Sequence, residues 1–328
     1  METELLSRLK GRKLNIWQSF LARAGLEADQ NSDSTVLIWD GGELVAAGSR
    51  LGNLLKCIAV AESHQGEGLT AKLLSTLRQD AFSTGHRHLF LYTKPKNRPM
   101  FSSLFFYPVV QTDQVLLMED RRGGIQAFLD SQPVPRKEGR IGALVMNCNP
   151  FTLGHRHLVA TASEECDHVY VFVLSEDRSR FSASERMKLV VEGTRNFSNV
   201  TVLPTGPYLI SSATFPTYFL PDRENAGQVK CRLDVEIFLK YYVPHFGINV
   251  RYVGTEPLSP VTNQYNEMLE QLLPPAGVAL RLIPRITTGD GSPISASRVR
   301  QYLDEGNPDA VRDLVPESTW KYLMGKGE

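Results

Sequence analysis

The chain has 328 residues, more than one hydrophobic core usually organises, so its length predicts two domains. Hydrophobic residues make up 42% and charged residues 22% of the chain, as in a globular protein, and 36 basic residues balance 36 acidic ones. This formal net charge of zero argues against a protein that binds nucleic acid or a membrane surface.

The first 125 residues have the pattern of a mixed α+β domain. Two strands flank a Gly41-Gly42 turn and form a predicted hairpin. Aromatic residues from Phe101 to Tyr107 are expected to pack in the core of this domain. The expected elements are helices over residues 1–25, strands over 35–39, 43–47, 54–60, 86–92 and 115–118, and an amphipathic helix over 71–82.

A glycine-rich turn follows the strand over 54–60, with the pattern Gln65-x-x-Gly68-x-Thr70. The order of hairpin, strand, turn and helix resembles the GNAT acetyltransferases, whose Q/R-x-x-G-x-G/A turn holds the pyrophosphate of acetyl-CoA through backbone amides. The resemblance implies a GNAT-like fold and a CoA-type turn at Gln65, Gly66 and Gly68. Thr70 stands where that family has glycine or alanine. Its branched side chain is expected to obstruct a pyrophosphate, so we expect the fold without acetyl transfer.

Between residues 120 and 140 the chain becomes rich in proline and charge, as in SQPVPRKEGR. A short helix is predicted within it, over residues 125–129. Such a composition is typical of an interdomain connection. We therefore expect a GNAT-like domain over residues 1–125 and a second domain over residues 138–328.

The second domain opens with an apolar run from Ile141 to Met146, typical of a parallel strand that is buried on both faces. A polar turn follows, in which Thr152 is a plausible N-cap and Gly154 lets the backbone approach a ligand. His155 then lies in the first turn of a helix. Free N–H groups and the helix dipole favour an anion at such a turn, and an imidazole there can hydrogen-bond a phosphoryl oxygen. The pattern predicts a phosphate site.

Strands and helices alternate after this turn. A strand over 169–174 leads to Arg178 and Arg180, which would lie at the crevice where open parallel sheets bind ligands. Ser182 and Glu185 form a capping box that predicts another helix. The remaining expected elements are strands over 200–203, 250–253 and 278–283, a helix over 230–242, and an aromatic, hydroxyl-rich pocket wall over 206–221. This alternation predicts a doubly wound parallel sheet of the Rossmann-like α/β class.

Two motifs in this half resemble the signatures of the nucleotidyltransferase superfamily. Thr152-x-Gly154-His155 matches the form T-x-G-H, and residues 293–300 resemble I-S-S-S/T-x-x-R, with Ala296 in place of the central serine. The resemblance implies a grip on a triphosphate from two helix N-termini. The catalytic residues it implies are His155, Thr152 and Arg300. The ATP-binding residues it implies are Asn147, Asn149, Gly154, Arg178, Gly254, Glu256, Ser295 and Ser297.

The order of several longer segments resembles the citrate lyase ligase family across essentially the whole chain. These segments are NPFTLGHRHLV, SEDRSRF, SSATFPTYF, VGTEPLSPVTNQYNE and ISASRVR. The resemblance implies an acid–thiol ligase that uses ATP and Mg²⁺ to form acetyl adenylate. It would then acetylate the phosphoribosyl-dephospho-CoA thiol on the acyl carrier (gamma) subunit of citrate lyase, releasing AMP and pyrophosphate and activating the lyase.

Two other interpretations remain open from the sequence. The chain could be an adenylyltransferase for a phosphorylated small molecule, fused to an independent acetyltransferase. Alternatively, the N-terminal half could be a docking module for a partner protein, with only the second half active. The first alternative would need a pocket for a substrate phosphate, whereas the ligase needs room only for acetate.

The four cysteines are scattered without a Cys-x-x-Cys pair. Their spacing argues against a zinc site or a disulfide framework and suits a reducing compartment. No apolar run approaches the length of a membrane-spanning helix. We therefore expect a cytoplasmic protein without a metal site of its own.

Overall fold

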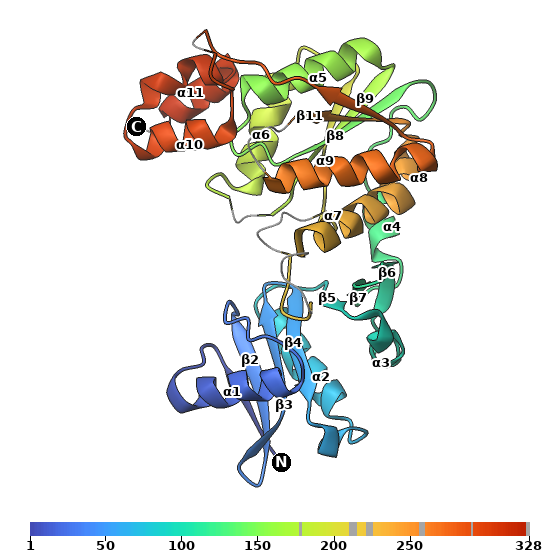
Figure 1. Cartoon of the computed structure of the whole chain (residues 1–328), viewed down its shortest axis with the longest axis vertical. Coiled ribbons are helices and arrows are strands. Elements are labelled where there is room, and N and C mark those ends of the chain that lie inside the picture. Colours follow the sequence, from blue (N-terminus) through green and yellow to red (C-terminus); the bar gives the residue numbers. More distant parts are fainter. Residues whose placement is uncertain (177–178, 210–214, 221–225, 256–259, 290, 326–328) are drawn as a thin grey trace. The chain divides into compact units, whose positions relative to one another are not determined.

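A computed structural model describes residues 1–176, 179–209, 215–220, 226–255, 260–289 and 291–325 (Figure 1). The chain divides into two compact units. The first unit comprises Met1–Gly124 together with Pro216–Val229, and the second comprises Ile125–Phe215 together with Lys230–Glu328. A piece of the C-terminal half of the chain therefore belongs to the first unit.

The first unit is built on a seven-stranded sheet in the order β1-β2-β3-β4-β5-β7-β6. Neighbouring strands are antiparallel except β4 and β5, which run parallel and pair through Leu54 with Phe90 and Leu55 with Leu91. Its strands are β1 (Glu2–Leu6), β2 (Ser34–Asp40), β3 (Glu43–Leu51), β4 (Leu54–Val60), β5 (Phe90–Thr93), β6 (Tyr107–Gln111) and β7 (Leu116–Glu119). Its helices are α1 (Gly11–Arg23), α2 (Leu69–Ser83) and α3 (Arg98–Ser103), with short 3₁₀ turns at Glu62–His64 and Pro95–Asn97. The predicted hairpin and the amphipathic helix are confirmed, and Leu73, Leu74 and Leu77 of α2 are buried in the core.

Two predictions for this unit are wrong, and one strand was missed. Residues Glu2–Leu6 form a strand instead of a helix, because they pair with β2 along the edge of the sheet, and such long-range pairing overrides local propensity. Strand β6 was not predicted. Within the aromatic cluster, Phe101 and Phe106 are buried, but Phe105 is 69% exposed and adopts φ 62°, in the turn that ends α3.

The segment from the C-terminal half is attached to the first unit by hydrogen bonds. The Tyr218 hydroxyl donates to the carbonyl oxygen of Tyr92 at 3.2 Å, and the Glu27 amide donates to the carbonyl oxygen of Tyr218 at 2.8 Å. The sequence predicts a pocket wall of the second domain over 206–221. Residues 210–214 of that stretch lie outside the described residues, and 216–220 lie in the first unit, where Tyr218 is buried.

The second unit contains a five-stranded sheet in the order β10-β9-β8-β11-β12, and all neighbouring strands are parallel. The predicted doubly wound sheet is confirmed. Its strands are β8 (Ile141–Met146), β9 (His168–Val173), β10 (Val200–Pro204), β11 (Val250–Gly254) and β12 (Ala279–Ile283). Its helices are α4 (Gly124–Asp130), α5 (Leu153–Glu165), α6 (Ala183–Thr194), α7 (Ala226–Ile237), α8 (Val243–Phe246), α9 (Pro260–Leu272), α10 (Ala296–Asp304) and α11 (Glu317–Gly325), with a π-helical turn at Phe238–Tyr242 and 3₁₀ turns at Pro274–Ala276 and Pro308–Leu314.

Helices cover both faces of this sheet, and Figure 1 shows α5 on one side and α9 on the other. On the α5 and α6 face, Val159 and Leu189 join the strands in one apolar core. On the opposite face, the ring of Phe172 packs against Tyr242 and Phe246. The central strand β8 lies between β9 and β11, so the chain changes direction across the sheet at the β8–β11 boundary. Parallel sheets bind ligands at the carboxyl ends of the strands beside such a switch point.

Candidate nucleotide site

The turn after β8 begins helix α5 as predicted. Thr152 is the N-cap, and its hydroxyl accepts a hydrogen bond from the His155 amide at 3.3 Å. In return, the Thr152 amide donates to Nδ1 of His155 at 3.1 Å. The two residues satisfy backbone groups at the start of the helix reciprocally, as in a capping box. Phe151 stacks on the His155 ring at a centroid distance of 5.9 Å, which further restricts the imidazole.

These contacts determine the tautomer of His155. Since Nδ1 accepts a hydrogen bond from a backbone amide, the proton of the neutral ring lies on Nε2. Burial, together with the nearby charge of Arg285, lowers the pKa of His155 to about 4. The imidazole is therefore neutral at pH 7 and can donate a hydrogen bond from Nε2, which suits contact with a phosphoryl oxygen.

The second signature lies directly against the first. Ser295 is the N-cap of α10, and its hydroxyl accepts a hydrogen bond from the Arg298 amide at 3.2 Å. A Cβ atom added to Gly154 would lie 3.3 Å from the carbonyl oxygen of Ile294, so the absence of a side chain at Gly154 allows this close approach. The structure thus brings together two helix N-termini that are about 140 residues apart in the sequence.

Arg300 connects the two signatures. Its Nη1 donates to the carbonyl oxygen of Asn149 at 2.6 Å, and its Nη2 donates to the Ser297 hydroxyl at 3.2 Å. Burial lowers the pKa of Arg300, but a guanidinium titrates so far above neutrality that it keeps its charge at pH 7. Arg300 is only partly buried, so it presents a positive charge beside the turn that carries Thr152 and His155.

The side-chain oxygens of Asn147 and Asn149 accept hydrogen bonds from other parts of the protein. The Asn147 side-chain oxygen accepts hydrogen bonds from Arg186 at 2.7 Å and from Ser179 at 3.5 Å. The Asn149 side-chain oxygen accepts one from the Phe181 amide at 3.2 Å. Their oxygens therefore fix the turn to α6 and to the loop that precedes it, which is a positioning role.

Arg186 is a residue of this site that our sequence analysis missed. Its side chain is fully buried, and it donates to the carbonyl oxygens of Phe181 at 3.1 Å and Asn147 at 2.9 Å and to that of Glu176. A detectable signal existed, because Arg186 precedes Leu189 and Val190 by three and four residues and so lies on the apolar face of α6. An arginine on such a face indicates a buried, hydrogen-bonded charge.

We expect Arg186→Lys to lower the free energy of unfolding by about 2 kcal/mol. Lysine keeps the positive charge, but its single ammonium group cannot replace the hydrogen bonds that the guanidinium donates to several separate carbonyl oxygens. Urea denaturation of the variant and the parent would measure this loss. Lys188→Arg, on the same helix, is the control and should unfold like the parent. Equal midpoints for Arg186→Lys and the parent would mean that Arg186 does not hold the turn together.

The remaining predicted site residues of this unit lie at other strand ends or outside the described residues. Gly254 ends β11, and a Cβ atom there would lie 3.6 Å from the Leu158 side chain of α5, which is ordinary packing. Arg178 and Glu256 lie outside the described residues. Arg180 forms an ion pair with Asp304, the last residue of α10, so its side chain contacts that helix.

Arg285 is a second basic residue that our sequence analysis missed. It follows β12, and its Nε donates to the carbonyl oxygen of Thr255 at 2.9 Å. Its charge reaches His155, as the lowered pKa of that imidazole indicates. Arg285 and Arg300 therefore place positive charge beside the described part of the site, as an anionic ligand requires.

The predicted CoA-type turn lies in the first unit. Gly66 and Gly68 both have left-handed backbone conformations, with φ 88° and 76°, and added Cβ atoms would meet nothing within 4 Å. Gln65 and Glu67 are exposed in the same turn, and Thr70 is partly buried in the first turn of α2. The turn is open to solvent, and Glu67 adds a negative charge to it.

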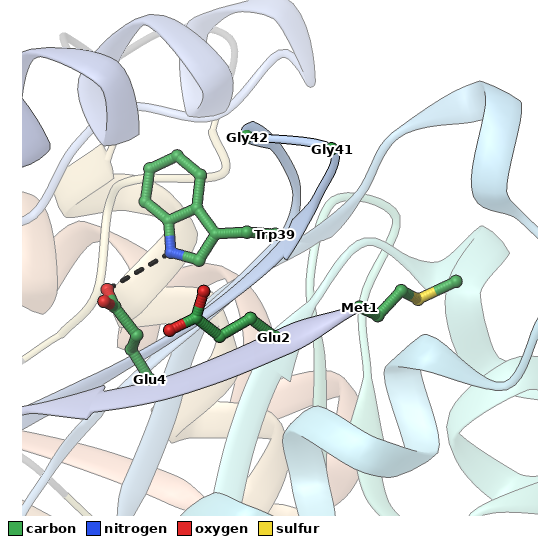
Figure 2. A pocket seen from close by; sticks show the side chains of 6 residues that line it. All are labelled: Met1, Glu2, Glu4, Trp39, Gly41 and Gly42. Carbon is green, nitrogen blue, oxygen red and sulfur yellow. Dashed lines mark hydrogen bonds between the residues drawn. The ribbon is translucent and has the colours of Figure 1, made fainter.

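A pocket of about 490 Å³ also lies on the first unit, lined by Met1, Glu2, Glu4, Trp39, Gly41 and Gly42 (Figure 2). Glu4 accepts hydrogen bonds from Trp39 at 3.2 Å and from Lys13 at 2.7 Å. Lys13 is the main cause of the lowered pKa of Glu4, so this carboxylate is ionised at pH 7. The two glutamates that line the pocket would repel a polyphosphate, so this pocket does not match the nucleotide site.

No helix among the described residues has the length and apolar character needed to cross a membrane.

In comparisons with known proteins, residues 141–323 match the citrate lyase ligase C-terminal domain, and residues 4–102 match the acetyltransferase (GNAT) family.

Three curated relatives resemble the chain over nearly its full length. It is 41% identical to the citrate (pro-3S)-lyase ligase of Klebsiella pneumoniae, over 94% of this chain and 92% of the relative. The proteins of the same name from Haemophilus influenzae and Escherichia coli are each 36% identical, over 96% and 97% of this chain and 96% and 92% of the relatives. Because these matches run through both units and the C-terminal family match alone spans more than half of the sequence, the chain belongs to the citrate lyase ligase family.

Proposed function

We propose that this chain is an ATP-dependent acid–thiol ligase that activates acetate as acetyl adenylate and transfers the acetyl group to a thiol. The thiol is that of the phosphoribosyl-dephospho-CoA group on the acyl carrier subunit of citrate lyase. The names of the three relatives support citrate lyase as the partner. The observation that carries the nucleotide chemistry is the juxtaposition of the Thr152–His155 cap with Arg300.

The proposed reaction has two steps. An oxygen of acetate attacks the α-phosphorus of ATP, the bond from that phosphorus to the bridging oxygen breaks, and pyrophosphate leaves with the electron pair. The thiolate of the carrier then attacks the acetyl carbon, and AMP leaves with the electrons of the carbon–oxygen bond. Acetate alone is a poor acyl donor, so the first step supplies the leaving group.

The turn is suited to positioning and charge stabilisation. His155 can donate from Nε2 to an α-phosphoryl oxygen, and Arg300 can attract the departing pyrophosphate. Cys148, the thiol nearest in sequence, is fully buried, and this burial raises its pKa far above neutrality. A covalent acyl-enzyme on Cys148 would need an ionised, accessible thiol, so direct attack by acetate on ATP fits this turn better.

Mg²⁺ is expected to enter with ATP. Within the described ranges, no group of three or more His, Cys, Asp or Glu side chains could hold a metal ion. These residues therefore do not form a protein cage for Mg²⁺. Phosphate oxygens and water can serve as ligands of the ion, as is usual for nucleotide-bound magnesium.

Pyrophosphate–ATP exchange tests the proposal. Acetate should support exchange of labelled pyrophosphate into ATP, and phosphorylated acceptors such as phosphopantetheine should not. Acceptor-dependent exchange without acetate dependence would instead indicate an adenylyltransferase for a phosphorylated small molecule. Transfer is then tested with the purified acyl carrier subunit, whose mass should increase by one acetyl group only when ATP and acetate are both present.

We expect the GNAT-like unit not to use acetyl-CoA. Thr70 at the start of α2 and the exposed charge of Glu67 both disfavour a pyrophosphate at the turn. Acetyl-CoA should therefore bind weakly in calorimetry and should not replace ATP plus acetate in acetylation of the carrier thiol. Rapid acetylation from acetyl-CoA without ATP would show that this unit is a working acetyltransferase.

A further inference from the structure

Arg251 is a buried arginine and the second residue of β11. It is 1% exposed, and it pairs in register with Ala143 of β8 and Leu280 of β12. Its strand neighbours Val250 and Tyr252 belong to the apolar core on the α5 face. Since side chains alternate along a strand, Arg251 points to the opposite face, toward Phe238. It lies three residues before Gly254, where β11 ends at the carboxyl edge of the sheet.

Two nitrogens of the Arg251 guanidinium have no hydrogen-bond partner among the residues that the structure describes. Its Nε and Nη1 atoms are buried and make no hydrogen bond, and its Cζ lies 4.7 Å from the centroid of the Phe238 ring. Burial lowers the pKa of Arg251, which reflects the cost of keeping this charge away from water. Buried charges in proteins are normally paired and hydrogen-bonded, so two free donors in the interior call for an acceptor.

The neighbouring charges do not supply one. Lys230 and Asp234 of α7 are both buried and form an ion pair at 2.5 Å, which engages the carboxylate whose charge acts on Arg251. Lys230 also lies 5.4 Å above the ring of Tyr265. Among these buried side chains, two cations face one carboxylate. Glu176, which is partly exposed after β9, acts on Asp234 from the carboxyl edge. Among the described side chains, none forms an ion pair with Arg251.

We propose that Arg251 binds the carboxylate of the small monocarboxylic acid that the ligase activates. This inference rests on the proposed function and assigns a residue to its acid substrate. The free Nε or Nη1 of this guanidinium can donate a charge-assisted hydrogen bond to a carboxylate oxygen. Lys230 engages Asp234, so the single charge of Arg251 is matched by a monoanion. Phe238 offers an apolar wall to the methyl end.

The position of Arg251 suits this role. It lies on β11, next to β8, and the end of β11 at Gly254 and the turn with Thr152 and His155 after β8 both lie at the carboxyl edge of the sheet. Arg251 can hold one carboxylate oxygen while the other is directed toward the α-phosphorus at that edge. It takes no proton in the reaction, so it acts by binding and orientation.

The test compares Arg251→Met and Arg251→Lys with the parent. In acetate-dependent pyrophosphate exchange, Arg251→Met should raise the KM for acetate at least about tenfold and leave the KM for ATP within about twofold. Arg251→Lys keeps the charge and should show a smaller increase. Arg232→Met is the matched control, because Arg232 is exposed on α7, and it should change neither KM.

Thermal unfolding provides a second readout that does not depend on activity. Sodium acetate should raise the Tm of the parent relative to sodium chloride at equal ionic strength, and it should not raise that of Arg251→Met. Without acetate, Arg251→Met should be at least as stable as the parent, because it removes an unpaired buried charge. A variant that unfolds in acetate-free buffer would show that Arg251 is structural, and this would overturn the inference.

The outcomes separate the two proposals. If the parent shows no acetate-dependent exchange, the proposed function fails. If the parent is active and Arg251→Met keeps the parental KM for acetate, the function stands and the assignment of Arg251 is wrong. A KM for ATP that rises together with that for acetate would place Arg251 at the nucleotide, which also contradicts the assignment.

Discussion

Arg300→Ala is expected to slow acetate-dependent pyrophosphate exchange by roughly 30-fold to 1000-fold, the effect of losing about 2 to 4 kcal/mol of transition-state stabilisation. The physical reason is its position between the two signatures, where it is held by the Asn149 carbonyl and the Ser297 hydroxyl. From there its positive charge can stabilise the negative charge that develops on the departing pyrophosphate. Steady-state exchange at saturating acetate measures the effect.

The same hydrogen bonds give Arg300 a structural role that must be separated from the chemical one. Removing it leaves the Asn149 carbonyl without this donor, so the Tm and the folded fraction should be recorded for each variant. Arg300→Lys keeps the positive charge but cannot make both hydrogen bonds of the guanidinium. It should therefore exchange faster than Arg300→Ala and more slowly than the parent. Arg195→Ala at the exposed end of α6 is the control and should exchange at the parental rate. A parental rate in folded Arg300→Ala would place the pyrophosphate elsewhere.

Local signals predicted the start of the site well. The strand Ile141–Met146, the cap at Thr152 and the capping box of Ser182 with Glu185 all depend on residues within a few positions of one another. The strand can be inferred from its apolar run, and the two caps can be inferred because hydrogen bonds at a helix start join an N-cap to the residue three positions later. Ser295 caps α10 as well, and the sequence pointed to a helix start there through the resemblance of residues 293–300 to the second signature.

Contacts between distant segments were beyond such reasoning. The pairing of Glu2–Leu6 with β2 and the attachment of Tyr218 to Tyr92 depend on the tertiary fold and have no local pattern. Arg186 and Arg251 were missed for a related reason. Both are charged residues on buried faces, and a sequence pattern does not show which carbonyl or ligand meets such a charge.

His155→Ala is expected to lower acetate-dependent pyrophosphate exchange by roughly 100-fold or more while changing ATP affinity much less. The Thr152 amide holds Nδ1, so the neutral ring presents its N–H at Nε2. A hydrogen bond from this donor to an α-phosphoryl oxygen strengthens as charge moves onto that oxygen, and it therefore stabilises the transition state more than bound ATP. Exchange kinetics and equilibrium binding of ATP measure the two effects separately.

The control for this variant lies two residues away. His157 lies on a different face of α5, so His157→Ala should change neither exchange nor ATP affinity. His155→Ala also removes half of the capping interaction with Thr152, which should cost about 1 kcal/mol of stability. Both variants should therefore be compared at a temperature where circular dichroism shows them fully folded.

The pH dependence of stability tests the same assignment without substrates. His155 has a pKa of about 4 in the folded protein and an ordinary value of 6.5, so the unfolded chain binds a proton that the folded chain does not between these values. The contribution of His155 to stability is therefore present above pH 6.5 and is lost as the pH falls toward 4. His155→Ala should flatten this part of the profile relative to His157→Ala. Near-normal exchange together with an unchanged profile would mean that the imidazole is neither buried as a neutral donor nor used in nucleotidyl transfer, and that the motif serves only to cap α5.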